Sequence, residues 1–216
     1  MVRTLRELLS DRLLLLWLVY DAMKYKTFGE TKIQKLCFLS EWKMLDNHEK
    51  GFNYDFIRLT HGPYSPDVEE DVEWLENNQL VEALPINEKV NIFRETRFGR
   101  KLLKDFDSVF MRNNIFTQKI AAINRKYAPM SLQDLLSEVY SMPHPYMKGE
   151  RTIGELRPRT PLLYKIETQK ARVTFNITKE ELATLDIYLD DENYRSVMLA
   201  GESAKRRPLL PFDEVF

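Results

Sequence analysis

Six carboxylates lie close together between residues 67 and 76, and no Lys or Arg interrupts the segment from Ser65 to Asn78. Acidic side chains can pair with a cationic protein surface, whereas a helix that reads DNA needs Lys and Arg to contact phosphates. We therefore predict that this segment stays out of the major groove. It is either a docking surface for a basic partner or an ordinary solvated helix face. The six residues are Asp67, Glu69, Glu70, Asp71, Glu73 and Glu76.

Five other side chains are candidates for contact with a partner. His61 and Tyr64 flank a Gly-Pro pair, which forms either a functional loop or a purely structural turn. Lys32 and Lys35 lie about one helical turn apart and form either a partner-facing pair or two ordinary exposed lysines. Trp74 lies off the apolar stripe of its predicted helix, so it is either an interface anchor or an edge-of-core residue.

The sequence offers little for catalysis or metal binding. His61 and His144 have no nucleophile or carboxylate partner at motif spacing, and no Gly-rich phosphate loop is present. Cys37 is the only cysteine, and the three histidines are scattered singly, so no zinc spacing exists. We predict no enzymatic activity, no metal and no cofactor. Cys37 sits in an apolar run, which favours a buried thiol in a reducing compartment.

The composition is that of a soluble globular protein. Of 216 residues, 44% are hydrophobic and 30% charged, and Lys+Arg 32 nearly balance Asp+Glu 33 to give a formal net charge of −1. A polyanion could therefore bind only to a local basic patch. The most hydrophobic stretch, residues 13–20, is far shorter than the roughly 20 residues of a membrane span. Since the N-terminus also lacks a signal-peptide layout, we predict a cytoplasmic protein without membrane contact.

Three helices are predicted in the first part of the chain. Apolar residues recur at helical spacing from Leu5 onward, nearly all round the helix, which is typical of a helix in the middle of a core. Thr31 and Gln34 resemble a capping box that opens a second helix. Ser65 as N-cap and Pro66 at the first position begin a third helix that runs to about residue 77. Its inward residues are Val68, Val72 and Leu75.

A hairpin and three more helices follow. Residues 80–93 alternate around a turn, and Thr96 then caps a helix that extends through about residue 110. Three helices, a two-stranded wing and a closing helix follow the order of a winged-helix domain. Further helices are predicted over residues 115–127 and 131–141. We therefore expect an α+β fold, mainly helical, with a winged-helix-like domain over residues 1–141.

The last third of the chain differs in composition. Residues 142–170 form a basic, Pro-rich stretch without helical or strand periodicity, which predicts a linker. Residues 172–177 alternate as a strand with Val173, Phe175 and Ile177 inward, and Thr178 with Glu181 opens a helix beyond it. Residues 142–216 are thus predicted to be an extension whose deletion leaves a folded protein. The tail over residues 205–212 is expected to become ordered only on docking.

Two motifs resemble a known family. Residues 32–38 (Lys-Ile-Gln-Lys-Leu-Cys-Phe) and 61–65 (His-Gly-Pro-Tyr-Ser), with a weaker match over 68–81, are similar to the SocA-like antitoxin domain, also called Panacea. His61 stands where that family more often has an aromatic residue. The resemblance implies a bacterial or phage antitoxin that neutralises a toxin by direct binding. Some relatives instead hand a toxin to a protease as adaptors, and such domains also occur in anti-phage defence systems.

Two functions follow as expectations. The first is an antitoxin that occludes its toxin with the surface from His61 to Trp74, as the resemblance implies. The second is a DNA-binding regulator that uses a basic wing and residues 172–207, which loosely resemble a ribbon-helix-helix arm. The chain is expected to act as a monomer or a homodimer. The basic residues of the wing region are Arg94, Arg97, Arg100, Lys101 and Lys104.

Overall fold

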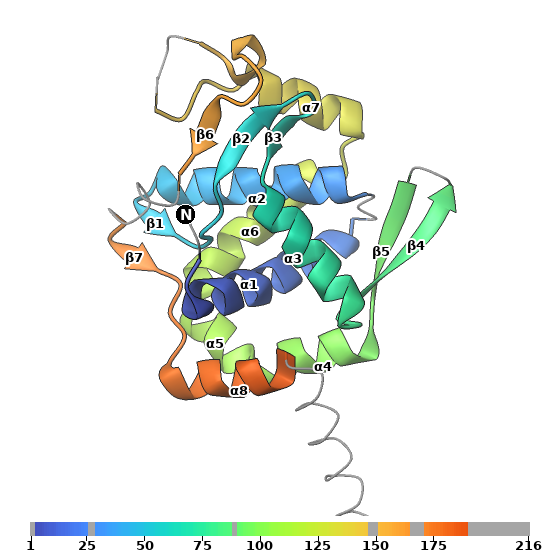
Figure 1. Ribbon diagram of the computed structural model, residues 1–216, viewed down its shortest axis with the longest axis vertical. Coiled ribbons are helices and arrows are strands. Elements are labelled where there is room, and N and C mark those ends of the chain that lie inside the picture. Colours follow the sequence, from blue (N-terminus) through green and yellow to red (C-terminus); the bar gives the residue numbers. More distant parts are fainter. Residues whose placement is uncertain (1–2, 26–28, 88–89, 147–150, 165–170, 190–216) are drawn as a thin grey trace, which may run out of the picture. The chain divides into compact units, whose positions relative to one another are not determined.

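The chain divides into two units, Met1–Ile177 and Thr178–Phe216. Helix α1 (Leu5–Met23) runs through the core of the first unit. Figure 1 shows the computed structural model, which describes residues 3–25, 29–87, 90–146, 151–164 and 171–189. Thr4 caps α1 in a capping box with Glu7. Leucines on every side of α1 are buried, as the sequence predicted. They are Leu9, Leu13, Leu14, Leu15, Leu16 and Leu18.

Helix α2 (Glu30–Leu45) is buried along almost its whole length and packs on α6 (Asn114–Tyr127). Its N-cap is Gly29 with φ 78°, a left-handed conformation that suits glycine, and no side chain caps the helix. The predicted capping box of Thr31 and Gln34 is therefore wrong. Gln34 instead bonds to the backbone of Ser65, 31 residues away. Cys37 is buried, as predicted.

A three-stranded antiparallel sheet lies beside α2 in the order β3-β2-β6 (Figure 1). Strand β2 (Phe56–Leu59) turns tightly into β3 (Gly62–Tyr64), with Arg58 opposite Pro63. Strand β6 (Pro161–Leu163) pairs with the other edge of β2. A second, parallel pair joins β1 (Glu49–Lys50) to β7 (Val173–Thr174).

The remaining elements of the first half follow the predicted order. Helix α3 (Pro66–Asn77) leads into the hairpin of β4 (Val81–Asn87) and β5 (Val90–Glu95). Thr96 caps α4 (Arg97–Asp105), accepting a hydrogen bond from the Gly99 amide, and α5 (Asp107–Arg112) follows. The α+β, mainly helical fold class is confirmed. The winged-helix description itself stays a prediction.

The stretch predicted as a linker contributes to the first unit. After α7 (Leu132–Ser141), a short 3-10 helix η1 (Ile153–Glu155) and β6 place apolar side chains in the core. The unit boundary falls after Ile177, so it differs from the boundary predicted after residue 141. Val173 is 46% exposed, against the inward position predicted for it. The side chains buried by this region include Ile153, Leu162, Leu163, Phe175 and Ile177.

The second unit begins with α8 (Lys179–Leu189). Thr178 and Glu181 bond to each other's backbone amides at its start, as the predicted capping box requires. The second helix of a ribbon-helix-helix arm and the tail over residues 205–212 both lie outside the described residues. Among the helices that the structure describes, none has the length and apolarity that a bilayer crossing demands.

Glu41 of α2 is a fully buried carboxyl group. Its Oε2 accepts a hydrogen bond from the Phe52 amide at 2.8 Å, while Oε1 has no partner among the described residues. Burial raises the pKa of Glu41 to about 8, and the nearby Asp11 acts in the same direction. A group this far from water favours its neutral form, so we expect Glu41 to hold its proton in the folded chain.

The first prediction concerns the pH dependence of stability. A raised carboxyl pKa means that the folded state holds a proton that the unfolded state releases, so stability should fall as pH rises from about 5 to about 8. We expect a loss of about 2–4 kcal/mol over this range. The substitution Glu41→Gln gives a side chain that is neutral at every pH, so the free energy of unfolding should fall less steeply with pH in this variant. Urea denaturation at several pH values measures that free energy. An unchanged slope in the variant would show that Glu41 is ionised in the folded chain.

Candidate partner-binding site

The two motifs of the sequence meet in the structure through Gln34. Its side-chain amide donates to the Ser65 carbonyl at 2.9 Å, and the Ser65 amide donates back to its Oε1 at 3.0 Å. Both residues are buried, so this pair of bonds joins the start of α3 to α2. Ser65 holds the N-cap position as predicted, yet its hydroxyl forms no cap hydrogen bond. Gln34 therefore positions the start of α3, a role that its place in the motif does not predict.

A cavity of about 450 Å³ opens where these motifs meet, between α2 and the β2–β3 turn. Tyr64 donates a hydrogen bond to Glu69 on its wall, and this bond raises the pKa of Tyr64 to about 12. His61 lies exposed at the turn. The cavity thus brings together His61, Tyr64 and Lys35 of the predicted site. The full lining is Glu30, Thr31, Gln34, Lys35, Leu59, Thr60, His61, Gly62, Tyr64 and Glu69.

Lys32 and Lys35 do not form an exposed pair, so the expectation of a partner-facing lysine pair is wrong. Both are buried, 5% and 2% exposed. The Lys32 ammonium donates to the Ala128 carbonyl at 2.6 Å and ties α2 to the end of α6. Lys35 lies along the cavity wall, where its Cε would be 3.6 Å from a Cβ placed on Gly62. Burial lowers the pKa of Lys35 to about 8, against the opposing effect of Glu30.

Asp71 is fully buried and belongs to the core, so its predicted place on an exposed acidic surface is wrong. It pairs with Arg3 at 2.5 Å and with Arg12 at 3.0 Å, and it accepts a hydrogen bond from the Tyr54 hydroxyl at 2.9 Å. The reason is its position on the helix: residue 71 lies three after Val68 and four before Leu75, on the inward stripe. Asp71 therefore joins the N-terminal segment to α3.

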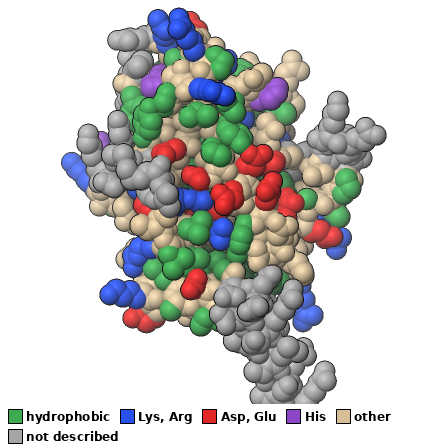
Figure 2. Space-filling view, in the orientation of Figure 1, with side chains coloured by type: hydrophobic (Ala, Val, Ile, Leu, Met, Phe, Trp, Pro, Cys, Tyr) green, Lys and Arg blue, Asp and Glu red, His purple; other side chains and the backbone are tan. Residues whose placement is uncertain are grey.

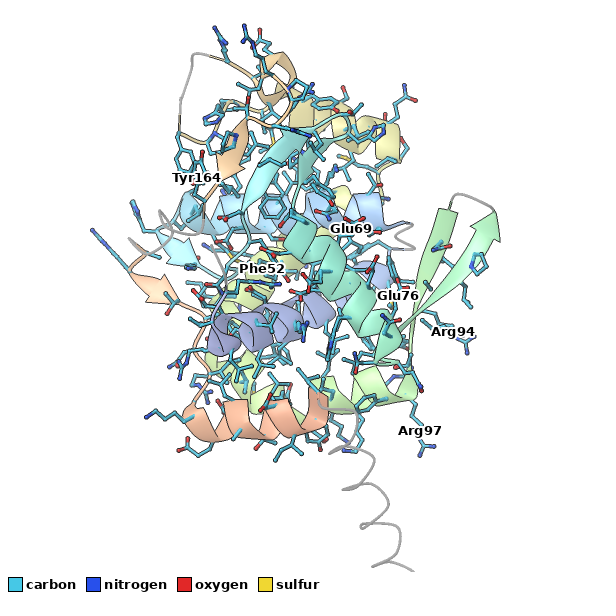
Figure 3. The ribbon with its side chains drawn as sticks, in the orientation of Figure 1. Phe52, Glu69, Glu76, Arg94, Arg97 and Tyr164 are labelled. Carbon is cyan, nitrogen blue, oxygen red and sulfur yellow. The ribbon has the colours of Figure 1, made fainter. Side chains whose placement is uncertain are left out.

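The other carboxylates of α3 fall in two rows. Glu69, Glu73 and Glu76 recur along one side of the helix and, together with Glu30 of α2, form what we call the acidic face. In Figure 2 red side chains gather at the middle of the molecule, and Figure 3 labels Glu69 and Glu76 at the two ends of the α3 row. Burial and then the like charges of Glu69, Glu73 and Glu76 raise the pKa of Glu30. The four carboxylates therefore lie close enough to repel one another.

The second row holds Asp67, Glu70 and Trp74, one helical turn apart. Asp67 lies 3.8 Å from the Arg3 guanidinium, and Glu70 is exposed. The guanidinium of Arg12 lies over the Trp74 ring, 4.1 Å from its centroid. Trp74 is half-buried by this cation–π contact, so it is an edge-of-core residue in the structure of the free chain.

The wing region carries acidic as well as basic side chains. Arg94 lies 3.7 Å from Glu82, Arg100 pairs with Glu95, and Lys101 lies 2.6 Å from Asp105. Arg94 and Arg97 project from β5 and the start of α4 in Figure 3. Cations paired in this way offer less net charge to DNA phosphates.

Comparison with known proteins adds no relative. No family model, curated protein or solved structure matches the chain. The similarity of the two motifs to the SocA-like domain therefore stays a prediction.

Proposed function

We propose that the chain is an antitoxin-type protein that binds a basic partner protein, its cognate toxin, through the acidic face and the cavity beside it. The observation that carries the proposal is the unpaired charge of this face. None of Glu30, Glu69, Glu73 and Glu76 forms an ion pair with a described residue, and burial and then the like charges of the other three raise the pKa of Glu30. Like charges held close together are unfavourable in the free chain and favour a cationic partner.

Occlusion is the mechanism we propose. A toxin that binds a nucleotide or nucleic acid presents a basic surface at its active site. The acidic face is complementary to such a surface and would steer the encounter at low ionic strength. Once the toxin is bound, the β2–β3 turn and α3 would cover that surface. The same contact would serve an adaptor that hands the toxin to a protease. We propose that the protein acts in the cytoplasm, where the buried thiol of Cys37 stays reduced.

The second prediction tests the acidic face. Replacing Glu69, Glu73 and Glu76 together with glutamine should weaken partner binding about 10- to 100-fold at low salt. Folding should change little, because these three side chains lie off the buried stripe of α3. Calorimetry or surface plasmon resonance with the purified partner, over a range of salt concentrations, measures the effect.

A matched control removes three exposed carboxylates elsewhere. Asp107→Asn, Glu138→Gln and Glu180→Gln make the same change in net charge and should leave the affinity within about twofold. An equal loss in both triple variants would mean that overall charge alone attracts the partner. An unchanged affinity in the Glu69, Glu73 and Glu76 variant would show that the acidic face is only solvated.

A further inference from the structure

Lys35 is a largely buried side chain whose ammonium opens on the cavity. It is 2% exposed and lines the cavity, and its ammonium makes no hydrogen bond or ion pair with any residue that the structure describes. Its nitrogen is not among the described polar atoms that are closed off from solvent without a partner, and Glu30 on the same wall attracts it. The neighbouring Lys32 differs, because its ammonium donates to a backbone carbonyl. The Lys35 ammonium can therefore donate to a ligand that enters the cavity.

The other charged side chains on the cavity wall are acidic. Glu30 and Glu69 are carboxylates on its wall, and Tyr64 donates to Glu69. A simple anion such as phosphate would meet Lys35 but would be repelled by the two carboxylates. A simple cation would leave Lys35 without an acceptor. The complementary ligand carries both a carboxylate and cationic groups, with a net positive charge.

We propose that this cavity binds a basic amino-acid residue with a free α-carboxylate, arginine or lysine, either as the free amino acid or as the last residue of a peptide. The α-carboxylate accepts from the Lys35 ammonium, and the cationic groups face Glu30 and Glu69. The aliphatic stem lies against Leu59. A volume of about 450 Å³ is within the ordinary range for a small-ligand site. This inference does not depend on the partner being a toxin.

The third prediction is a binding measurement on the full chain by isothermal titration calorimetry. We expect saturable binding of L-arginine or L-lysine, and about 10- to 100-fold weaker binding of agmatine, which is arginine without its carboxylate. The tripeptide Gly-Gly-L-arginine separates the two sources. If it binds and free arginine does not, the site takes a peptide C-terminus; if only free arginine binds, the site takes the amino acid.

Variants of α2 test whether Lys35 supplies the contact. Lys35→Met should lower the affinity for L-arginine about 10- to 100-fold while leaving agmatine unchanged. Lys43→Met, at an exposed position of the same helix, should change neither. Glu30→Gln should weaken L-arginine and agmatine alike. Thermal unfolding of each variant checks that it is folded.

Two results would overturn the proposal. One is the absence of saturable binding of L-arginine, L-lysine and Gly-Gly-L-arginine up to about 10 mM, where even weak specific sites are occupied. The other is binding of L-arginine that Lys35→Met leaves unchanged in a folded variant, because the carboxylate would then bind elsewhere. If Lys35→Met fails to fold, Lys35→Gln gives the same test, since it removes the charge and keeps a polar end.

Discussion

Asp71→Ala should lower the free energy of unfolding by about 3–5 kcal/mol, the largest effect that we expect from any single carboxylate of α3. The substitution leaves the side chains of Arg3, Arg12 and Tyr54 without their shared acceptor in a buried site. Arg3 keeps only longer contacts, with Asp11 at 3.2 Å and with Asp67 at 3.8 Å. Urea denaturation followed by circular dichroism measures the change.

The control for Asp71→Ala is a substitution at the adjacent residue. Glu70→Ala removes a carboxylate of the same helix from an exposed position and should change stability by no more than about 0.5 kcal/mol. The two variants together separate the structural carboxylate from the solvated one. Equal effects of the two substitutions would contradict the burial of Asp71. A loss of partner binding by Asp71→Ala would be a consequence of unfolding and would not place Asp71 in the interface.

Deleting residues 142–216 should abolish cooperative unfolding, in contrast to the expectation from composition. The deletion removes β6 from the edge of β2, and it removes six described buried apolar side chains from the first unit. At about 1.5–3 kcal/mol for each side chain, the loss is about 9–18 kcal/mol, which matches or exceeds the whole stability of a typical domain. The six are Ile153, Leu156, Leu162, Leu163, Phe175 and Ile177.

A shorter deletion provides the comparison. Removing only residues 178–216 leaves every described strand of the first unit in place, so this variant should still unfold cooperatively in a thermal melt. The longer deletion should give a broad transition or aggregate. A sharp transition in the variant that ends at residue 141 would show that β6 and its neighbours are dispensable for the core.

Local patterns in the sequence were enough to predict most helices and their starts. The pattern predicts Thr96 and Thr178 as caps, and each forms the expected hydrogen bond to a backbone amide. These signals are local, because a cap depends only on the next three residues. The inward stripe of α3 was predicted for the same reason, since helical spacing fixes which residues share a face.

Long-range contacts were the part that sequence patterns did not reveal. Strand β6 pairs with β2 from about 100 residues away, and its three residues lie between prolines and basic side chains that resemble a linker. The local pattern predicts Gln34 as a capping residue, whereas its hydrogen-bond partner, Ser65, is remote in sequence. Residue type alone predicts Asp71 at the surface, although its spacing from Val68 and Leu75 indicates the interior.

The candidate site was only partly predictable. The sequence motifs predict His61, Tyr64 and the α3 carboxylates as site residues, and the structure adds Glu30 from α2 to the acidic face. Lys32 and Lys35 were recognised as residues of a motif, but helix spacing does not reveal that one binds a carbonyl and the other faces a cavity. That difference depends on where α6 and the β2–β3 turn pack.

The most direct test of the proposed function is capture of the partner followed by co-expression. Tagged full-length protein is purified from its native cells, with one half of the lysate treated with nuclease. We predict a stoichiometric protein partner that survives nuclease treatment, arrests growth when expressed alone, and no longer does so when this chain is co-expressed. Recovery of a defined DNA sequence without a stoichiometric protein, or a partner that is harmless when expressed alone, would contradict the antitoxin proposal.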